Sequence, residues 1–134
     1  MNRMVEIHDS TFAGIEAVGP DVVVRLAPAY VHHSEGRPGV DPGSVWLQDV
    51  DLIIRQAAIE SSPSRFPGWL SEGILSIGEA IWENVIPLPL TAPGVVSFSA
   101  DTGEGETLVV RGMDAEALPR GEPRYVEPFP GATA

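Results

Sequence analysis

The chain has 134 residues, including 14 glycines and 13 prolines, no cysteine and a formal net charge of −11. This length is typical of one domain, and the absence of cysteine excludes disulfides, thiol catalysis and thiolate-bound metal centres. The excess of 19 acidic over 8 basic side chains argues against binding to nucleic acid or anionic membranes. It favours a basic protein as a partner.

The N-terminal segment Met1–Glu6 lacks the apolar region and cleavage site of a secretion signal. Uninterrupted apolar stretches are far shorter than the about 20 residues that span a bilayer. We therefore expect a soluble cytoplasmic protein that makes no membrane contact.

The first third of the chain predicts β-strands separated by turn residues. Val22–His32 alternates between two faces, as a strand does. Phe12–Val18 precedes it across the turn Gly19–Asp21, which predicts a hairpin. A further short strand is expected at Met4–His8. Pro28 has no amide proton, so it predicts an edge position or a β-bulge.

A glycine- and proline-rich segment, Ser34–Gly43, predicts a loop. The following segment, Ser44–Glu60, is strand-like, but its apolar positions change phase, which predicts a β-bulge near Gln48-Asp49. At about 3.3 Å per residue the segment is too long for a small domain. We therefore expect it to bend between two sheets or to break near Gln56.

Residues 69–86 combine two conflicting patterns. Apolar side chains recur at helical spacing at Leu70, Ile74, Ile77, Ile81 and Val85. Against a helix, Gly73 and Gly78 would each cost about 1 kcal/mol in its interior. We favour two strands, Ile74–Ile77 and Ile81–Ile86.

Prolines also shape the segment that follows. Ile86–Leu90 contains Pro87 and Pro89, so it must be extended, as an edge strand or a crossover. Such an edge offers a second copy of the chain a place to form a homodimer. Val95–Ala100 and Thr107–Gly112 flank a turn and predict another hairpin.

The C-terminal part carries weaker signals. Asp114–Leu118 is compatible with one helical turn, and Arg124–Glu127 with a last strand. Taken together, the patterns predict an all-β fold: an antiparallel two-sheet β-sandwich or flattened barrel with at most one short helix. We expect a single domain over residues 1–127 and a frayed tail over residues 128–134.

One short motif has a catalytic appearance. Asp101-Thr102-Gly103 resembles the catalytic loop of aspartic proteases, in which two carboxylates share a proton. Too little chain follows it for the flap and the later strands of that family. We interpret the motif as a hairpin turn and predict no catalytic residue.

The three histidines are His8, His32 and His33. Neighbouring residues of a strand point to opposite faces, so His32 and His33 cannot readily bind one metal ion. We predict no metal site and no cofactor.

A ligand site is the second interpretation of the chain. Alternation places Trp46 and Gln48 on one face of their strand. If Tyr30 or His32 joined them across the sheet, an aromatic pocket would result. The candidate ligand-binding residues are His8, Tyr30, His32, Trp46 and Gln48. They define the alternative function: a small-ligand-binding protein or enzyme with a pocket between the sheets.

The order of the segments carries a resemblance in style. His8-Asp9-Ser10, a hairpin, a glycine- and proline-rich loop, a long strand, Ile86–Pro89 and Gly121–Glu127 follow one another. In this the chain resembles small acidic uncharacterised bacterial β-rich proteins, some of them similar to immunity proteins of polymorphic toxin systems. The resemblance implies a cytoplasmic protein that neutralises a toxin by binding it. Our first interpretation is therefore a non-catalytic protein-binding module.

Overall fold

The computed structural model describes residues 1–65 and 67–132, which form an all-β structure without a helix. The predicted fold class is confirmed. The strands of this described part are β1 (Asn2–Glu6), β2 (Thr11–Val18), β3 (Asp21–Ser34), β4 (Gly43–Ser61), β5 (Gly68–Ile77), β6 (Ala80–Glu83), β7 (Val85–Leu88), β8 (Leu90–Thr102) and β9 (Thr107–Phe129).

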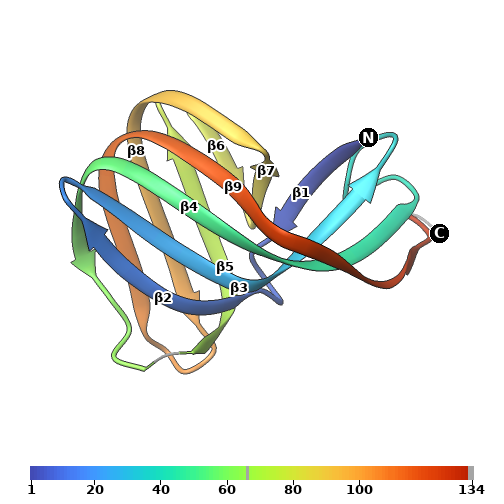
Figure 1. Ribbon diagram of the computed structural model, residues 1–134, viewed down its shortest axis with the longest axis horizontal. Helices are drawn as coiled ribbons and strands as arrows, with labels where there is room; N and C mark the ends of the chain where they lie inside the picture. The colour runs from blue at the N-terminus through green and yellow to red at the C-terminus, as the bar shows by residue number, and fades with distance from the viewer. Residues whose placement is uncertain (66, 133–134) are drawn as a thin grey trace.

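All these strands belong to one antiparallel sheet. The strands β2, β5, β8, β9, β4 and β3 follow one another in pairing order, and β3 pairs again with β2. This part of the sheet therefore closes into a ring, on the left in Figure 1. The two packed layers of the predicted sandwich or flattened barrel correspond to opposite sides of this ring.

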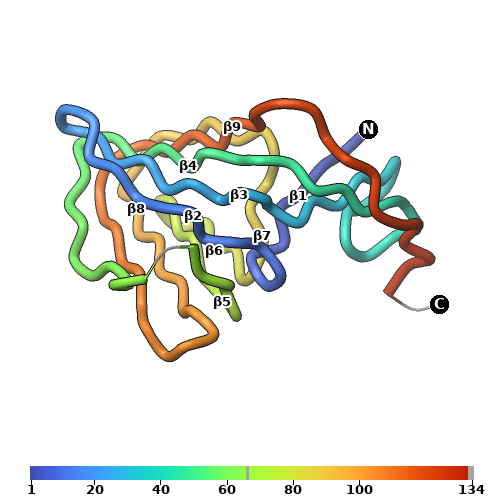
Figure 2. The backbone as a smooth tube through the Cα atoms, turned by 60° about the horizontal axis from the view of Figure 1, so that its bottom comes forward, coloured from blue at the N-terminus to red at the C-terminus, as the bar shows by residue number. Residues whose placement is uncertain are grey.

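The strands β3, β4 and β9 continue past the ring into an extension, on the right in Figure 1. There β1 pairs with β3, and β7 pairs with β1. The N-terminus and the last described residues of the chain lie at this end of the molecule, as Figure 2 also shows.

The core fills the inside of the ring with side chains from alternating strand positions. Each fully buried aliphatic or aromatic side chain stabilises the fold by roughly 1.5–3 kcal/mol relative to an exposed one. The largest are Phe12, Phe98, Ile7, Leu26, Leu52, Ile54, Leu70, Leu75, Ile86 and Leu108.

Irregularities in pairing allow the long strands to bend. The register of β3 against β4 shifts around Pro28, and that of β4 against β9 shifts between Leu47 and Asp49. A further shift lies at Gln56, which has a positive φ of 44°. The predicted bulges at Pro28 and Gln48-Asp49 are confirmed, and β4 bends at Gln56 without ending there.

Residues 69–86 form strands, as predicted, but with other bounds: β5 already begins at Gly68, and the predicted strand Ile81–Ile86 is divided at Asn84 into β6 and β7. β5 and β6 make a hairpin whose turn contains Gly78, with φ of 60°. This left-handed conformation suits glycine and explains why the helical spacing of apolar residues does not produce a helix. The β2–β3 and β8–β9 hairpins were also predicted correctly.

One expectation for the C-terminal part is wrong. Asp114–Leu118 forms no helical turn, because β9 pairs there with β4 on one side and β8 on the other. Arg124–Glu127 lies in a strand, as predicted, but as part of β9, which continues from Thr107 to Phe129.

The start of the tail also differs from the expected boundary at residue 128. Pro128 pairs with Ser44, and β9 ends one residue later. Farther along, the amide of Ala132 donates a hydrogen bond to the carbonyl of Val40. Residues 133 and 134 of the predicted tail lie outside the described residues.

The predicted edge strand is β7, which pairs with β1 at one end of the strand order. Ile86 and Leu88 point into the core and are 0% and 4% exposed. Pro87 lacks an amide proton. This edge therefore presents few apolar side chains and few hydrogen-bond donors to a second copy of the chain.

Candidate functional site

The candidate ligand residues on β3 and β4 lie on two different faces of the sheet. Trp46 is in register with Val31. Residues in register share a face, and successive residues alternate between faces. Trp46 and Gln48 therefore lie on the face opposite to Tyr30 and His32.

His8 lies apart from the other four candidates, in the turn after β1. Its ring packs edge-on against Trp69, with 5.5 Å between the centroids. Its Nδ1 lies 3.0 Å from the carbonyl oxygen of Ser71, and its Nε2 lies 3.5 Å from the carboxylate of Asp9. The five candidates do not line a common cavity.

His32 is a packing residue between β3 and the end of β9. Its ring contacts Tyr30 and Phe129 edge-on, with centroid distances of 5.5 and 4.9 Å. Only 4% of the residue is exposed. Neither ring nitrogen has a hydrogen-bond partner within the described part of the chain, although the carboxylate of Glu6 lies 3.8 Å from Nε2.

The histidine that meets Trp46 is His33. Their rings stack, and Tyr125 of β9 closes the group edge-on, 5.3 Å from Trp46. Burial, and secondly the charge of Arg3, lower the pKa of His33 below its usual 6.5. His33 and Tyr125 were not among the predicted ligand residues, because their position beside Trp46 depends on the register of three strands.

Gln48 lines a polar cleft where β9 bulges away from β4. The cleft has a volume of about 320 Å³ and also contains Arg120 and Arg124. The side-chain amide of Gln48 donates a hydrogen bond of 2.8 Å to the carbonyl of Gly121. This interaction holds the bulge of β9 against β4.

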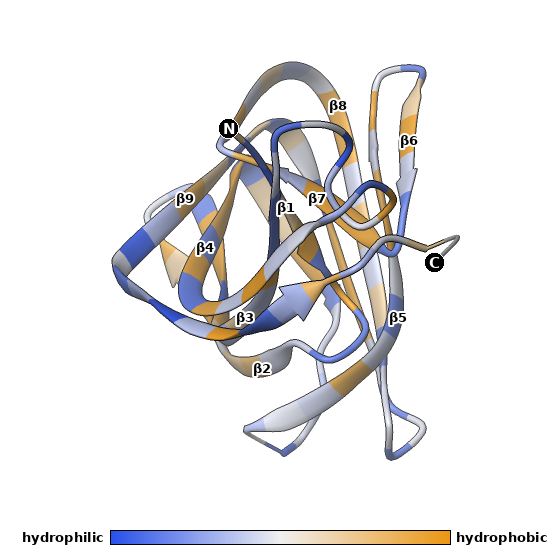
Figure 3. Cartoon of the chain, turned by 90° about the vertical axis from the view of Figure 1, so that its right-hand side faces the viewer, coloured by the Kyte–Doolittle hydropathy of each residue, from blue (hydrophilic) through white to orange (hydrophobic). Residues whose placement is uncertain are grey.

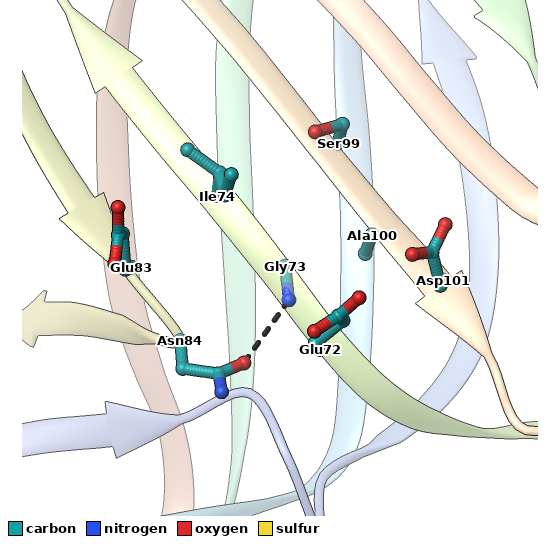
Figure 4. Close-up of a pocket in the computed structure, with 8 residues that line it drawn as sticks. All are labelled: Glu72, Gly73, Ile74, Glu83, Asn84, Ser99, Ala100 and Asp101. Carbon is teal, nitrogen blue, oxygen red and sulfur yellow. Dashed lines mark hydrogen bonds between the residues drawn. The ribbon is translucent and has the colours of Figure 1, made fainter.

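An acidic groove opens on the outer side of the sheet, over β5, β8 and the end of β6 (Figure 4). Its volume is about 300 Å³, at the lower end of the range for small-ligand sites. The lining residues are Glu72, Gly73, Ile74, Glu83, Asn84, Ser99, Ala100 and Asp101.

The backbone of the groove is fixed by Asn84, the residue after β6. Its side-chain Oδ1 accepts a hydrogen bond of 3.1 Å from the backbone amide of Gly73 (Figure 4). The backbone amide of Asn84 donates a hydrogen bond of 2.8 Å to the carbonyl of Gly73. A side chain at Gly73 would lie 2.9 Å from the carbonyl oxygen of Ser99. Glycine thus allows β5 and β8 to approach closely here.

Three carboxylates surround the groove: Glu72, Glu83 and Asp101. Within residues 1–65 and 67–132, none of them forms an ion pair, and no basic side chain lines the groove. By contrast, Asp51 of β4 lies between Arg25 and Arg120. The groove therefore presents uncompensated negative charge.

This groove was not predicted from the sequence, because its carboxylates come from three strands. Glu72 and Asp101 are partners in the register of β5 and β8. Each of the three acids lies near a glycine or a turn in the sequence. Many exposed acids do so, and this pattern therefore does not predict a groove.

Comparisons with known proteins add no identification. No protein family, curated protein or solved structure matches the chain. The described residues contain no cluster of three or more metal-binding side chains. Nor do they form a helix with the length and apolar character to cross a membrane.

Proposed function

We propose that the chain is a non-catalytic protein-binding module, comparable to an immunity protein, that binds a basic partner through its acidic groove. The observation that supports this proposal is the set of three carboxylates without a basic neighbour around a cavity of about 300 Å³. Such a cavity has room for a guanidinium or ammonium group of a partner.

The chemistry of the groove suits arginine in particular. A carboxylate accepts two parallel hydrogen bonds from one guanidinium group. Glu72 and Asp101 lie side by side in register, and Glu83 of β6 pairs with Ile74 at the other edge of β5. The net charge of −11 would also accelerate the approach of a cationic protein.

The alternative function, a ligand pocket lined by histidine and tryptophan, lacks a supporting cavity. Tyr30 and His32 lie on one face of the sheet, Trp46 and Gln48 on the other, and His8 in a separate turn. The geometry therefore favours the protein-binding proposal.

The proposal is tested by titrating isotope-labelled protein with a hexa-arginine peptide and following the backbone amide signals by NMR. We expect the largest shifts at residues 72–74, 83–84 and 99–101, and weaker binding at higher salt. A triple variant, Glu72→Gln, Glu83→Gln and Asp101→Asn, should weaken binding by about tenfold or more.

A control variant removes three carboxylates from the extension instead: Glu35→Gln, Asp49→Asn and Glu122→Gln. It changes the net charge by the same amount, so it should reduce binding only slightly. Equal losses in both variants, or shifts spread evenly over the surface, would contradict a defined site in the groove.

A further inference from the structure

The outer face next to the groove carries several large apolar side chains that are exposed. Large aliphatic side chains project from neighbouring strands: Ile81 of β6 and Val95 of β8 are 65% and 66% exposed. Ile74 of β5 and Met113 of β9 are 46% and 40% exposed. We call these four side chains the apolar patch. Figure 3 shows the hydrophobic segments of the β5–β6 hairpin at one side of the molecule.

The register brings the patch onto one surface. Ser76 pairs with Ile81 on one side and with Ser97 on the other, so these three side chains form a row. On the other side of β8, Val95 pairs with Met113 of β9. Serines thus lie between the aliphatic side chains, and the exposed Arg111 of β9 continues their row.

The apolar patch and the acidic groove are continuous. Ile74 belongs to both, since it lines the groove between Glu83 and Ser99 (Figure 4). An apolar centre with charged groups at its margin is the usual composition of a protein interface.

We propose that one basic protein partner docks on this combined surface, placing aliphatic side chains on the apolar patch and an arginine or lysine in the groove. This proposal rests on the proposed function and specifies the partner further: charge alone is insufficient, and the partner must carry an apolar segment beside its cation.

Charge complementarity decides between a partner protein and a second copy of this chain. Packing two copies through this face would bring Glu72, Glu83 and Asp101 of both copies together, each chain carrying −11. Like charges at such an interface are unfavourable. A cationic partner instead neutralises the three carboxylates.

The test compares two octapeptides of equal charge by calorimetry. In one peptide arginine alternates with valine, and in the other arginine alternates with serine. We expect the valine peptide to bind the wild-type protein about tenfold more tightly, which corresponds to burying one aliphatic side chain.

A double variant, Ile81→Thr and Val95→Thr, removes aliphatic surface outside the groove while retaining β-branched residues suited to strands. It should bind both peptides with the affinity that the wild type has for the serine peptide. If it does not fold, as judged by circular dichroism, Ile81→Thr alone makes the same test. A control variant, Val40→Thr and Val126→Thr, changes exposed valines outside the patch and should retain the preference.

The outcomes separate the two proposals. Equal binding of both peptides to the wild type would overturn the docking surface while leaving the charged groove intact. Failure of both peptides to bind would overturn the proposed function as well. A wild-type dimer in light scattering that the double variant disperses would show that the patch binds a second copy instead.

Discussion

The imidazole of His33 lies flat against the indole of Trp46, with 5.1 Å between the ring centroids and 16° between the planes. Burial and the charge of Arg3 lower the pKa of His33. The unfolded chain, with a histidine pKa of about 6.5, therefore binds this proton more readily than the folded chain. Stability should be greatest above about pH 6.5 and should decrease as the pH falls below that value.

This pH dependence is measured by urea unfolding between pH 7 and pH 5. Replacing His33→Phe retains an aromatic ring against Trp46 and removes the titrating group, so the variant should lose less stability over this range. If His33→Phe lost as much stability as the wild type, other groups would cause the dependence.

The stacking of His33 on Trp46 also shows which features can be predicted from sequence. Strands and turns follow from local patterns, such as the alternation in Val22–His32 and the turn at Gly78, and these were predicted correctly. The face on which a histidine meets Trp46 depends on how β3 and β4 are aligned. A displacement by one residue reverses every face, and the bulge at Pro28 changes the alignment.

The acidic groove could not be predicted for a related reason. Glu72, Glu83 and Asp101 belong to separate strands, and their proximity results from the pairing of β5 with both β6 and β8. Net charge predicted an acidic surface, whereas the position of the unpaired carboxylates required the three-dimensional structure.

Gly43 is expected to be intolerant of any side chain. A Cβ atom at this position would lie 1.9 Å from the carbonyl oxygen of His33, which belongs to the paired backbone of β3. Gly43→Ala should therefore lower the free energy of unfolding by about 1–3 kcal/mol, as overpacking typically does. Gly14→Ala is the control, since no atom lies within 4 Å of its Cβ position. Its effect should stay within about 0.5 kcal/mol, and equal effects of the two substitutions in urea unfolding would refute the steric argument.

Asn84 should stabilise the floor of the groove through both its backbone and its side chain. It has a positive φ of 62°, and its Oδ1 accepts the hydrogen bond from the buried amide of Gly73. Asn84→Ala should lower the free energy of unfolding by about 1–3 kcal/mol, because it leaves that amide unpaired and strains the backbone.

Asn84→Gly separates the two contributions, because glycine accepts the positive φ but provides no acceptor. Its stability should lie between that of the wild type and that of Asn84→Ala, and hydrogen exchange at Gly73 should be faster in both variants. Unchanged exchange at Gly73 would show that Asn84 does not protect this amide.

Substitution of Asp51 measures how much a buried carboxylate contributes to the stability of the sheet. It is 5% exposed and lies between two arginines, with Oδ2 at 2.8 Å from Nε of Arg120 and Oδ1 at 3.8 Å from Nε of Arg25. Asp51→Asn retains the shape but removes the charge, so the ion pairs with Arg120 and Arg25 are lost. We expect a loss of about 1–3 kcal/mol in the free energy of unfolding, below the about 3–5 kcal/mol for breaking a fully buried pair, because both arginines are partly exposed.

Glu60→Gln is the matched control, because it breaks an ion pair with Arg111 in which both side chains are largely exposed. Exposed pairs contribute about 0–1 kcal/mol, so this variant should stay close to the wild type in urea unfolding at neutral pH. Salt distinguishes the two sites further: 1 M sodium chloride should screen the exposed pair and affect the buried one much less. If Asp51→Asn were as stable as Glu60→Gln under both conditions, burial would add nothing to the ion pair between Asp51 of β4 and Arg120 of β9.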